Sequence, residues 1–433
     1  MSGPGMSKVL ISIYNMRLNK LIPVLLLSFL LTGQIACSKK NNTDTSPEEN
    51  TEEVPPKKDQ YPGLSVSATG ELLLNGNQFR GIGVNYFNAF IRTLEDGQQN
   101  NDTYKIGFNY LKERKIPFIR FALNGYWPKN WDLYLKNPDQ FFQNLDAFVK
   151  AAEASGIGLI PSFFWHTPTL PDLAGEPVNS WGKINSKTHE LMRKFIKEVV
   201  VRYRDSPAIW GWEQGNEVNL LVDLPGDNEN LPPVVPSLGT PTTRSKQDKL
   251  YTADLIVMMK QFATEISKYD GSRIIITGNA VARAAAWNLL NNKSWTTDTK
   301  EQFISMLNTQ NPNPVNVLST HAYIASSDNG YFGDEKVTYD GLIKASMDAA
   351  RAIKKPLFLG EFGAQQAKYG DATRDKFMEI LSAIESNEVP LSAMWVFDYP
   401  PHDTEEGINV SPDNGPREYM LQEIMKVNER ISK

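Results

Sequence analysis

Short apolar segments alternate with amphipathic segments along most of the chain. The apolar segments are rich in β-branched and aromatic residues and end in polar loops, which is typical of buried strands. We expect eight such strands, at residues 79–85, 117–121, 157–165, 208–216, 273–277, 315–320, 356–361 and 391–397. Between them apolar residues recur at helical spacing, which predicts helices at about 102–114, 138–155, 186–204, 248–268, 298–309, 339–354, 371–387 and 416–430.

The segment 138–155 shows how clear the helical pattern is. Phe141, Leu145 and Phe148 recur at helical spacing, Asn137-Pro138 is a start signal, and Gly156 follows the end. Eight strands that alternate with eight helices indicate an α/β fold, a single (β/α)8 TIM barrel over residues 61–433. In such a barrel the active site lies at the carboxyl ends of the strands.

The N-terminal residues 1–36 have the pattern of an export signal. An apolar run at 21–36 follows Arg17 and Lys20, is short for a membrane-spanning helix, and ends directly before Cys37, the only cysteine. This arrangement resembles the cleavage site of a bacterial lipoprotein, which implies that Cys37 is lipidated. An ordinary secretory signal followed by an incidental cysteine is the alternative.

Residues 37–60 cannot form a core. The stretch from Ser38 to Gln60 has one aliphatic residue, three prolines and many charges, which predicts a flexible linker. We therefore expect an exported lipoprotein whose catalytic domain stands away from a membrane on a tether. Because Ser38 rather than Asp follows the cysteine, we expect the outer membrane, at the cell surface or the periplasmic face.

Composition narrows the possible functions. A formal net charge of −5 disfavours binding to a nucleic-acid backbone. One cysteine excludes a disulfide framework and a cysteine zinc site, and four histidines leave little material for a histidine metal cluster. We expect no cofactor, no metal, no nucleic-acid partner, membrane contact through the lipid anchor alone, and a monomer.

Polar side chains gather at the predicted carboxyl ends of the strands. Glu217 follows the fourth strand and Glu361 ends the seventh, so their carboxyl groups face each other across the barrel mouth. Two carboxyl groups about 5–5.5 Å apart are the machinery of retaining glycoside hydrolysis. Glu213 shares strand parity with Glu217 and is its rival as the acid/base, although it lies one layer deeper. The other residues at these ends are Arg120, His166, Asn216, His321, Tyr323 and Trp395.

Four motifs make the pattern specific. WEQGNEVN (212–219), HAY (321–323), LGEFG (359–363) and AMWVF (393–397) resemble, in this order, glycoside hydrolase family 5 of clan A, the cellulase and mannanase family. The resemblance implies that Glu217 is the acid/base and Glu361 the nucleophile, and that Arg120 braces the nucleophile. It also implies that His166, Asn216, His321, Tyr323 and Trp395 bind substrate. Val218 and Thr167 depart from the family pattern.

We therefore expect a retaining glycoside hydrolase that cleaves a β-1,4-glucan or β-mannan, in an endo fashion and by double displacement. The alternatives are a catalytically weak glycan-binding surface lipoprotein and an exo-acting β-glycosidase on oligosaccharides. The segment GIGVNYFNAF (81–90) favours mannanases over cellulases slightly. The loop 220–246 is expected to form a wall of the cleft and to set chain-length preference.

The tryptophan and histidine side chains can either bind substrate or pack in the core, and the sequence alone does not separate the two roles. We expect half of the loop tryptophans to stack on sugars and half to pin loops onto the barrel. These tryptophans are Trp127, Trp131, Trp165, Trp181, Trp287 and Trp295. Trp210 and Trp212 are expected in the core, His189 is expected to be structural, and His402 is not counted as a cleft residue.

Overall fold

The computed structural model describes residues 57–95, 97–98, 100–324, 330–333 and 337–432. One compact unit spans Lys57–Lys433. The predicted signal peptide, Cys37 and most of the predicted linker lie outside the described residues. Within the described part, no helix is both long enough and apolar enough to cross a bilayer.

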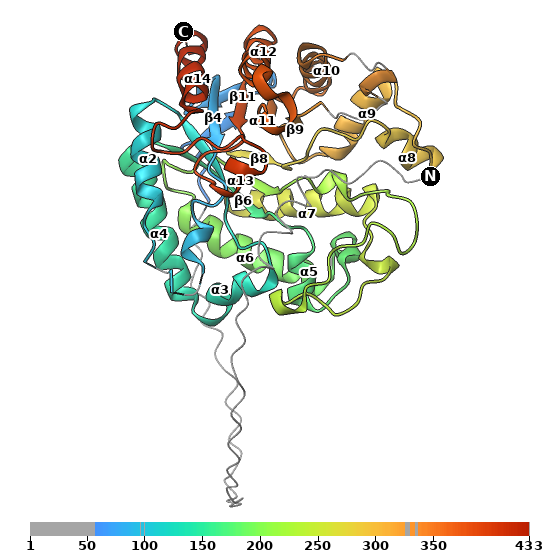
Figure 1. The fold of residues 1–433 in the computed structure, drawn as a ribbon. Helices are drawn as coiled ribbons and strands as arrows, with labels where there is room; N and C mark the ends of the chain where they lie inside the picture. The colour runs from blue at the N-terminus through green and yellow to red at the C-terminus, as the bar shows by residue number, and fades with distance from the viewer. Residues whose placement is uncertain (1–56, 96, 99, 325–329, 334–336, 433) are drawn as a thin grey trace, which may run out of the picture. The chain divides into compact units, whose positions relative to one another are not determined.

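Within the described residues, eight parallel strands form the barrel, and each overlaps a predicted strand. Figure 1 shows the helices arranged around these strands. Their order in the sheet is β8-β7-β6-β5-β4-β11-β10-β9. The strands are β4 (Gly81–Asn85), β5 (Phe118–Ala122), β6 (Gly158–Phe164), β7 (Gly211–Gly215), β8 (Ile274–Ile276), β9 (Leu318–Ala322), β10 (Leu357–Phe362) and β11 (Leu391–Met394). Between β8 and β9 the Ile275 amide donates to Asn316 Oδ1 (2.7 Å), and the Asn316 amide donates to the Ile275 carbonyl (3.3 Å). These contacts bring the two ends of the strand order together, as a (β/α)8 barrel requires.

In the part of the chain that the structure describes, eight long helices follow the strands, as predicted. They are α2 (Tyr104–Glu113), α4 (Pro138–Ser155), α6 (Lys187–Tyr203), α7 (Thr252–Tyr269), α9 (Lys300–Gln310), α10 (Tyr339–Ala352), α12 (Thr373–Ser386) and α14 (Glu418–Ile431). Helix α4 has the predicted ends, because Asn137 accepts a hydrogen bond from the Gln140 amide and Gly156 ends the helix with φ 69°. Helix α7 begins later than predicted, because Asp254 accepts a hydrogen bond from the Tyr251 amide and starts a new helix there.

Strand residues alternate between the barrel interior and the helix layer. On β5, Ile119 and Phe121 pack in the large core under the helices, while Phe118 joins a second apolar cluster inside the barrel. That inner cluster also takes Ile160 of β6 and Phe358 of β10. The lower barrel is therefore filled with apolar side chains, and polar residues are left for its carboxyl end.

An N-terminal antiparallel sheet was not among the predicted elements. It consists of β1 (Leu64–Val66), β2 (Leu72–Leu74) and β3 (Asn77–Gln78). Leu64 and Leu72 belong to the inner cluster, and the Leu64 amide donates to the Trp210 carbonyl just before β7. The small sheet thus covers the amino-terminal end of the barrel, opposite the strand ends that carry the predicted site.

Short helices also occupy the connecting loops, where the sequence pattern predicted only irregular structure. The α-helices are α3 (Asp132–Lys136), α5 (Thr169–Ala174), α8 (Ala286–Asn292), α11 (Gln366–Tyr369) and α13 (Pro401–Thr404). The 3₁₀ helices used below are η2 (Pro128–Trp131), η4 (Val218–Leu220) and η5 (Pro236–Leu238).

Candidate active site

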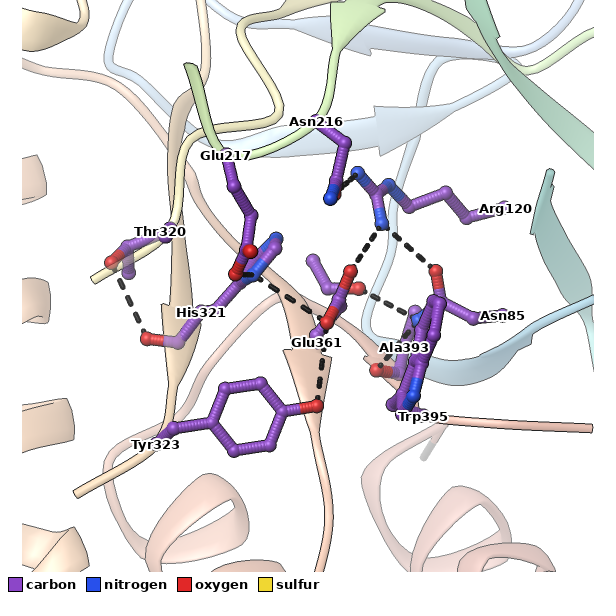
Figure 2. Close-up of polar contacts among 12 residues, drawn as sticks. Asn85, Arg120, Asn216, Glu217, Thr320, His321, Tyr323, Glu361, Ala393 and Trp395 are labelled. Atoms are coloured by element: carbon purple, nitrogen blue, oxygen red, sulfur yellow. Dashed lines mark hydrogen bonds and ion pairs between the residues drawn. The ribbon is translucent and has the colours of Figure 1, made fainter. Parts of the chain in front are cut away.

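Figure 2 shows most of the predicted site residues in one polar network at the carboxyl end of the barrel. Arg120, Asn216, Glu217, His321, Tyr323 and Glu361 are joined by direct hydrogen bonds or ion contacts. Trp395 lies beside this network. His166 belongs to a neighbouring aromatic cluster instead.

Arg120 holds the centre of the network. It is fully buried on β5 and points into the barrel, with the same parity as Phe118. Its Nε donates to both oxygens of Glu213 (2.8 and 2.9 Å), and its Nη1 donates to Glu361 Oε1 (3.0 Å). Its Nη2 donates to Asn216 Oδ1 (2.8 Å). One guanidinium therefore balances two buried carboxylates and orients the residue next to Glu217.

A β-bulge aims Glu361 into the barrel mouth. Leu359 pairs with Ser392 of β11, but Phe362 pairs with Met394, so Gly360 and Glu361 together face one residue. The same shift occurs on the β9 side. Because the bulge breaks the alternation, Glu361 faces inward while Leu359 and Phe362 both pack in the helix layer.

Glu361 lies in a buried and charged environment. Its Oε1 accepts from Arg120, and its Oε2 accepts from the Tyr323 hydroxyl (3.3 Å). Burial raises the pKa of Glu361 and the charge of Glu217 adds to the rise, whereas His321 and Arg120 oppose it. The two donors on Glu361 favour the negative charge on its carboxyl group.

Glu217 sits on a strained turn after β7. Its backbone is left-handed, with φ 52°, and it leads into the short 3₁₀ helix η4. The Glu217 amide donates to the Gly278 carbonyl (2.8 Å), which ties this turn to the end of β8. Backbone strain of this kind is typical of functional sites, where the surrounding structure holds a side chain in a required direction.

His321 lies between the two glutamates. Its Nδ1 is 2.9 Å from Glu217 Oε1 and 3.6 Å from Glu361 Oε2. Its Nε2 is buried and has no hydrogen-bond partner among the described residues. An unpartnered buried N–H costs more than an unpartnered lone pair, so the hydrogen belongs on Nδ1 and is donated to Glu217 Oε1.

The two carboxyl groups lie at short range. One oxygen of Glu217, one oxygen of Glu361 and His321 Nδ1 are all within 4.8 Å of one another. So close an approach of the two groups agrees with a retaining pair, whose carboxyl groups are about 5–5.5 Å apart, better than with an inverting pair at roughly 6.5–9.5 Å. The same three atoms could also offer ligands to a divalent ion, although glycoside hydrolysis by two carboxyl groups requires none.

His166 makes its contacts in a separate cluster of aromatic side chains, with Tyr126 and Trp127. Its ring stacks on Tyr126 with a centroid distance of 4.3 Å, and its Nδ1 is 3.0 Å from Thr169 Oγ1. Burial lowers the pKa of His166 to about 3, and the positive charge of Arg244 adds to this. His166 is therefore a neutral side chain at any ordinary pH.

The loop tryptophans divide between the site and the core. Trp165 stacks near Trp395, with centroids 6.2 Å apart, and its ring lies 4.5 Å from the Arg120 guanidinium carbon. Trp127 packs against His166. In contrast, Trp131 and Trp181 are buried in the core, Trp287 is partly buried against it, and Trp295 is exposed. Trp210 and Trp212 are buried, as predicted.

The rival residues have other roles. Glu213 is fully buried beneath the site and bound to Arg120, so it cannot reach a substrate as the acid/base. His189 is also buried, and its Nε2 lies 2.8 Å from the Trp181 carbonyl, which agrees with a structural role. Val218, which departs from the family pattern, is buried in the core.

Asn85 is a site residue that the sequence pattern did not predict. It is fully buried at the end of β4, accepts from Arg120 Nη1 (3.0 Å) and donates to the Gly360 carbonyl (2.8 Å). It thereby fixes both Arg120 and the bulge that carries Glu361. The sequence did contain a signal for this role, because Asn85 is a polar residue at the carboxyl end of the first predicted strand.

The loop 220–246 is fastened to neighbouring loops. Arg244 donates to both oxygens of Asp172 on α5 (2.6 and 2.8 Å), and both side chains are almost fully buried. At Gly239, next to η5, the backbone packs so closely on Pro128 of η2 that a Cβ would lie 2.8 Å from the Pro128 side chain. The loop thus lies against the loops after β5 and β6. Its effect on chain-length preference stays a prediction.

Comparison with known proteins identifies the family. Residues 74–399 match the cellulase family, glycosyl hydrolase family 5. The chain is similar to mannan endo-1,4-beta-mannosidase F of Aspergillus clavatus, with 40% identity over 83 residues, which are 17% of this chain and 18% of that protein. It is also similar to a probable mannan endo-1,4-beta-mannosidase A of Aspergillus flavus, with 30% identity over 145 residues, which are 28% of this chain and 36% of that protein. The chain thus matches only a minor part of the length of each relative.

Solved structures show the same fold at low sequence identity. The endo-1,4-beta-mannanase of Rhizomucor miehei aligns with a TM-score of 0.59 and 16% identity, covering 85% of this chain and 99% of that one. The endo-beta-1,4-mannanase of Thermotoga petrophila aligns with a TM-score of 0.54 and 16% identity, covering 82% and 78%. Because the family match extends over most of the sequence and over every barrel strand, the chain belongs to the cellulase family, glycosyl hydrolase family 5.

Proposed function

We propose that this protein is a retaining, endo-acting β-mannanase in which Glu361 is the nucleophile and Glu217 the acid/base. The observation that carries the proposal is the carboxyl pair, in which one oxygen of Glu217 lies within 4.8 Å of one oxygen of Glu361. Arg120 and Tyr323 donate to Glu361 of this pair, which supports the assignment of the negative charge to Glu361. Glu217 contacts His321 and is the more exposed of the two, as a group that must meet the leaving oxygen.

In the first step Glu361 attacks the anomeric carbon, and the bond from this carbon to the glycosidic oxygen breaks. Glu217 gives its proton to the departing oxygen, so the leaving sugar is released as an alcohol and a glycosyl ester of Glu361 remains. In the second step Glu217 takes a proton from water, and the resulting hydroxide attacks the same carbon and displaces Glu361. Two inversions give net retention.

The neighbouring side chains support these steps. Asn216 Oδ1 is occupied by Arg120, which turns the amide so that its NH2 group can donate to a substrate hydroxyl. A hydrogen bond to the sugar 2-OH strengthens in the transition state. Trp395 offers an aromatic surface beside the nucleophile for the flat C–H face of the sugar.

The mannan preference rests on the relatives. Each sequence relative and each solved structure named above carries mannanase or mannosidase in its name, although the matched segments are short or of low identity. A β-1,4-glucanase is the second candidate, because the family as a whole is the cellulase family.

The test is reducing-end release from a panel of mannans, β-glucans and xylans by the protein and by Glu361→Ala. We expect release from mannan, loss of it in the variant, and product whose first-formed anomer keeps the β configuration in proton NMR. Glu217→Ala should still cleave aryl glycosides with good leaving groups, and azide should accelerate it by trapping the glycosyl ester. Release from glucan alone would overturn the mannan assignment, and binding without any release would favour the glycan-binding alternative.

We also propose that the protein is an exported lipoprotein anchored through Cys37. The support is the sequence alone: a positively charged segment, an apolar run, the cysteine, and a charged linker. The test is metabolic labelling with a radioactive fatty acid in a bacterial host. Label in the wild type and none in Cys37→Ser is the expected result, whereas equal labelling of both would exclude the anchor.

A further inference from the structure

The turn that carries Glu217 is fastened to the loop after β8 by the side chain of Asn219. Asn219 lies two residues after Glu217, in η4, and is almost fully buried. Its Oδ1 accepts a hydrogen bond from the Ala280 amide (2.9 Å), and its Nδ2 donates to the Ala280 carbonyl (3.0 Å). One side-chain amide thus pairs with both main-chain polar groups of a residue on the neighbouring loop.

These contacts prolong the pairing of β7 with β8 beyond the strands themselves. The ladder between the two strands ends at the last residue of β8. After it, the Glu217 amide donates to the Gly278 carbonyl (2.8 Å), and the Asn219 side chain then pairs with Ala280 in the place of a main chain. The turn is therefore held at Glu217 and again at Asn219, by the same loop.

Helix α9 also holds Asn219. Gln310, the last residue of this helix, is buried, and its Oε1 accepts a second hydrogen bond from Asn219 Nδ2 (3.0 Å). The Gln310 carbonyl accepts from Asn279 Nδ2 (2.8 Å), so the same residue also contacts the loop after β8. These partners fix the orientation of the Asn219 amide, because a flipped amide would place its NH2 group against the Ala280 N–H and its oxygen against two acceptors.

The left-handed backbone of Glu217 needs such support. A glutamate keeps a φ of 52° only where the surrounding structure enforces it. The amide contact of Glu217 alone would leave the residues after it free to relax, whereas the contacts of Asn219 fix the far end of the turn. Arg283 adds a contact there, since its Nη2 donates to the Leu220 carbonyl (2.6 Å). The direction of the Glu217 side chain therefore depends on contacts made by its neighbours.

We propose that Asn219 is a positioning residue for Glu217, and that its contacts with Ala280 and Gln310 hold the Glu217 carboxyl group where it can protonate the leaving oxygen. This role rests on the proposed function of Glu217 as the acid/base. Because Asn219 is buried, it acts on the substrate through Glu217. Its loss impairs proton transfer to the leaving group and leaves the attack by Glu361 intact.

The test compares two aryl β-mannobiosides that differ only in the leaving group. The 2,4-dinitrophenolate group leaves without a proton, whereas 4-methoxyphenolate needs one from the acid. We expect Asn219→Ala to lower kcat/KM about 100-fold for the methoxyphenyl substrate, since a small misplacement of a reacting group has effects of this size. For the dinitrophenyl substrate kcat/KM should fall by less than about threefold, because it reports only formation of the glycosyl ester. Aryl cellobiosides replace the mannobiosides if the polymer panel identifies a glucanase.

The matched control is Asn428→Ala. Asn428 on α14 is also buried and makes the same pair of contacts, because its Oδ1 accepts from the Ile82 amide (2.8 Å) and its Nδ2 donates to the Ile82 carbonyl (2.9 Å). This control should lose stability as Asn219→Ala does and keep the wild-type ratio of kcat/KM between the two leaving groups. Gln310→Met serves where Asn219→Ala does not fold. It removes one acceptor of Asn219 and little volume, and should lower kcat/KM for the methoxyphenyl substrate about fivefold, the effect of one hydrogen bond.

Hydrogen exchange, followed by mass spectrometry, tests the contacts without activity. Peptides that contain residues 216–221 and 278–283 should exchange faster in Asn219→Ala than in the wild type, and at the wild-type rate in Asn428→Ala. Equal losses of kcat/KM with both leaving groups, no loss with either, or unchanged exchange in these peptides would overturn the positioning role alone. A wild type that cleaves none of the polymers or aryl glycosides would count against the proposed function, and the exchange would still decide whether Asn219 holds the turn.

Discussion

Arg120 is the residue on which most of the site depends. It is fully buried and joins Asn85, Glu213, Asn216 and Glu361, which come from three other strands of the barrel and the turn after one of them. A buried carboxylate that loses its partner is costly, because neither water nor another cation replaces the lost interaction. The arginine therefore supports both the stability of the barrel and the negative charge of Glu361, the proposed nucleophile.

We predict that Arg120→Met lowers the free energy of unfolding by about 3–5 kcal/mol, because Glu213 is left buried without a cation. Urea unfolding at neutral pH measures this. We also expect kcat to fall by at least about 100-fold, since Glu361 loses one of the donors that orient it. Arg120→Lys keeps the charge without the planar fork, so it should lose less stability than the Met variant. Equal stability of Arg120→Met and the wild type would contradict this account.

Among the strands and turns, two local irregularities create the geometry of the candidate active site. The bulge in β10 turns Glu361 inward, and the left-handed turn after β7 carries Glu217. Gly278 at the end of β8 allows that turn to form. It has φ 74°, and a Cβ there would lie 1.9 Å from the Gly215 carbonyl oxygen. The two strand ends can approach so closely only because residue 278 has no side chain.

We predict that Gly278→Ala displaces the β7 turn and lowers kcat by about 100-fold or more, since small misplacements of a reacting group have effects of this size. The matched control is Gly156→Ala. Gly156 also has a positive φ of 69°, but a Cβ there would meet nothing within 4 Å beyond its own chain neighbours. This control should therefore lose only about 1–2 kcal/mol of stability and no activity. Activity assays and thermal unfolding of the two variants check the prediction. Comparable kcat values for both would refute it.

In the molecule as a whole, the two ends of the barrel differ in composition, because one end is polar and the other is closed by apolar side chains. The carboxyl ends of the strands carry the polar network, while the small sheet β1–β3 closes the opposite end with Leu64 and Leu72. The apolar inner cluster between them separates the closing sheet from the site. We therefore expect substitutions in the closing sheet to change stability without changing activity.

We predict that Leu64→Ala lowers the free energy of unfolding by about 2–5 kcal/mol, because it opens a cavity in a fully buried position. Its kcat should match that of the wild type below the unfolding transition. Leu73→Ala, in the same sheet but only half-buried, should cost less stability. A strong loss of kcat in folded Leu64→Ala would show that the two ends are coupled.

The barrel and the positions of its strands and helices could be predicted from the order of residues alone. Periodicity suffices for this, because alternation of buried strands with amphipathic helices leaves few ways to bury the apolar faces. The motifs around Glu217 and Glu361 also indicated the family. What the pattern could not supply was the closing sheet at residues 64–78, whose short strands have no period of their own.

The assembly of the site, in contrast, depends on the folded chain. Strict alternation would have placed Glu361 on the same side as Leu359, and the bulge that turns it inward arises from pairing with both neighbouring strands. Asn85 acquires its role through a contact 275 positions away in the sequence. Burial and the charge of Glu217 raise the pKa of Glu361, and both depend on three-dimensional packing that no local pattern of residues contains.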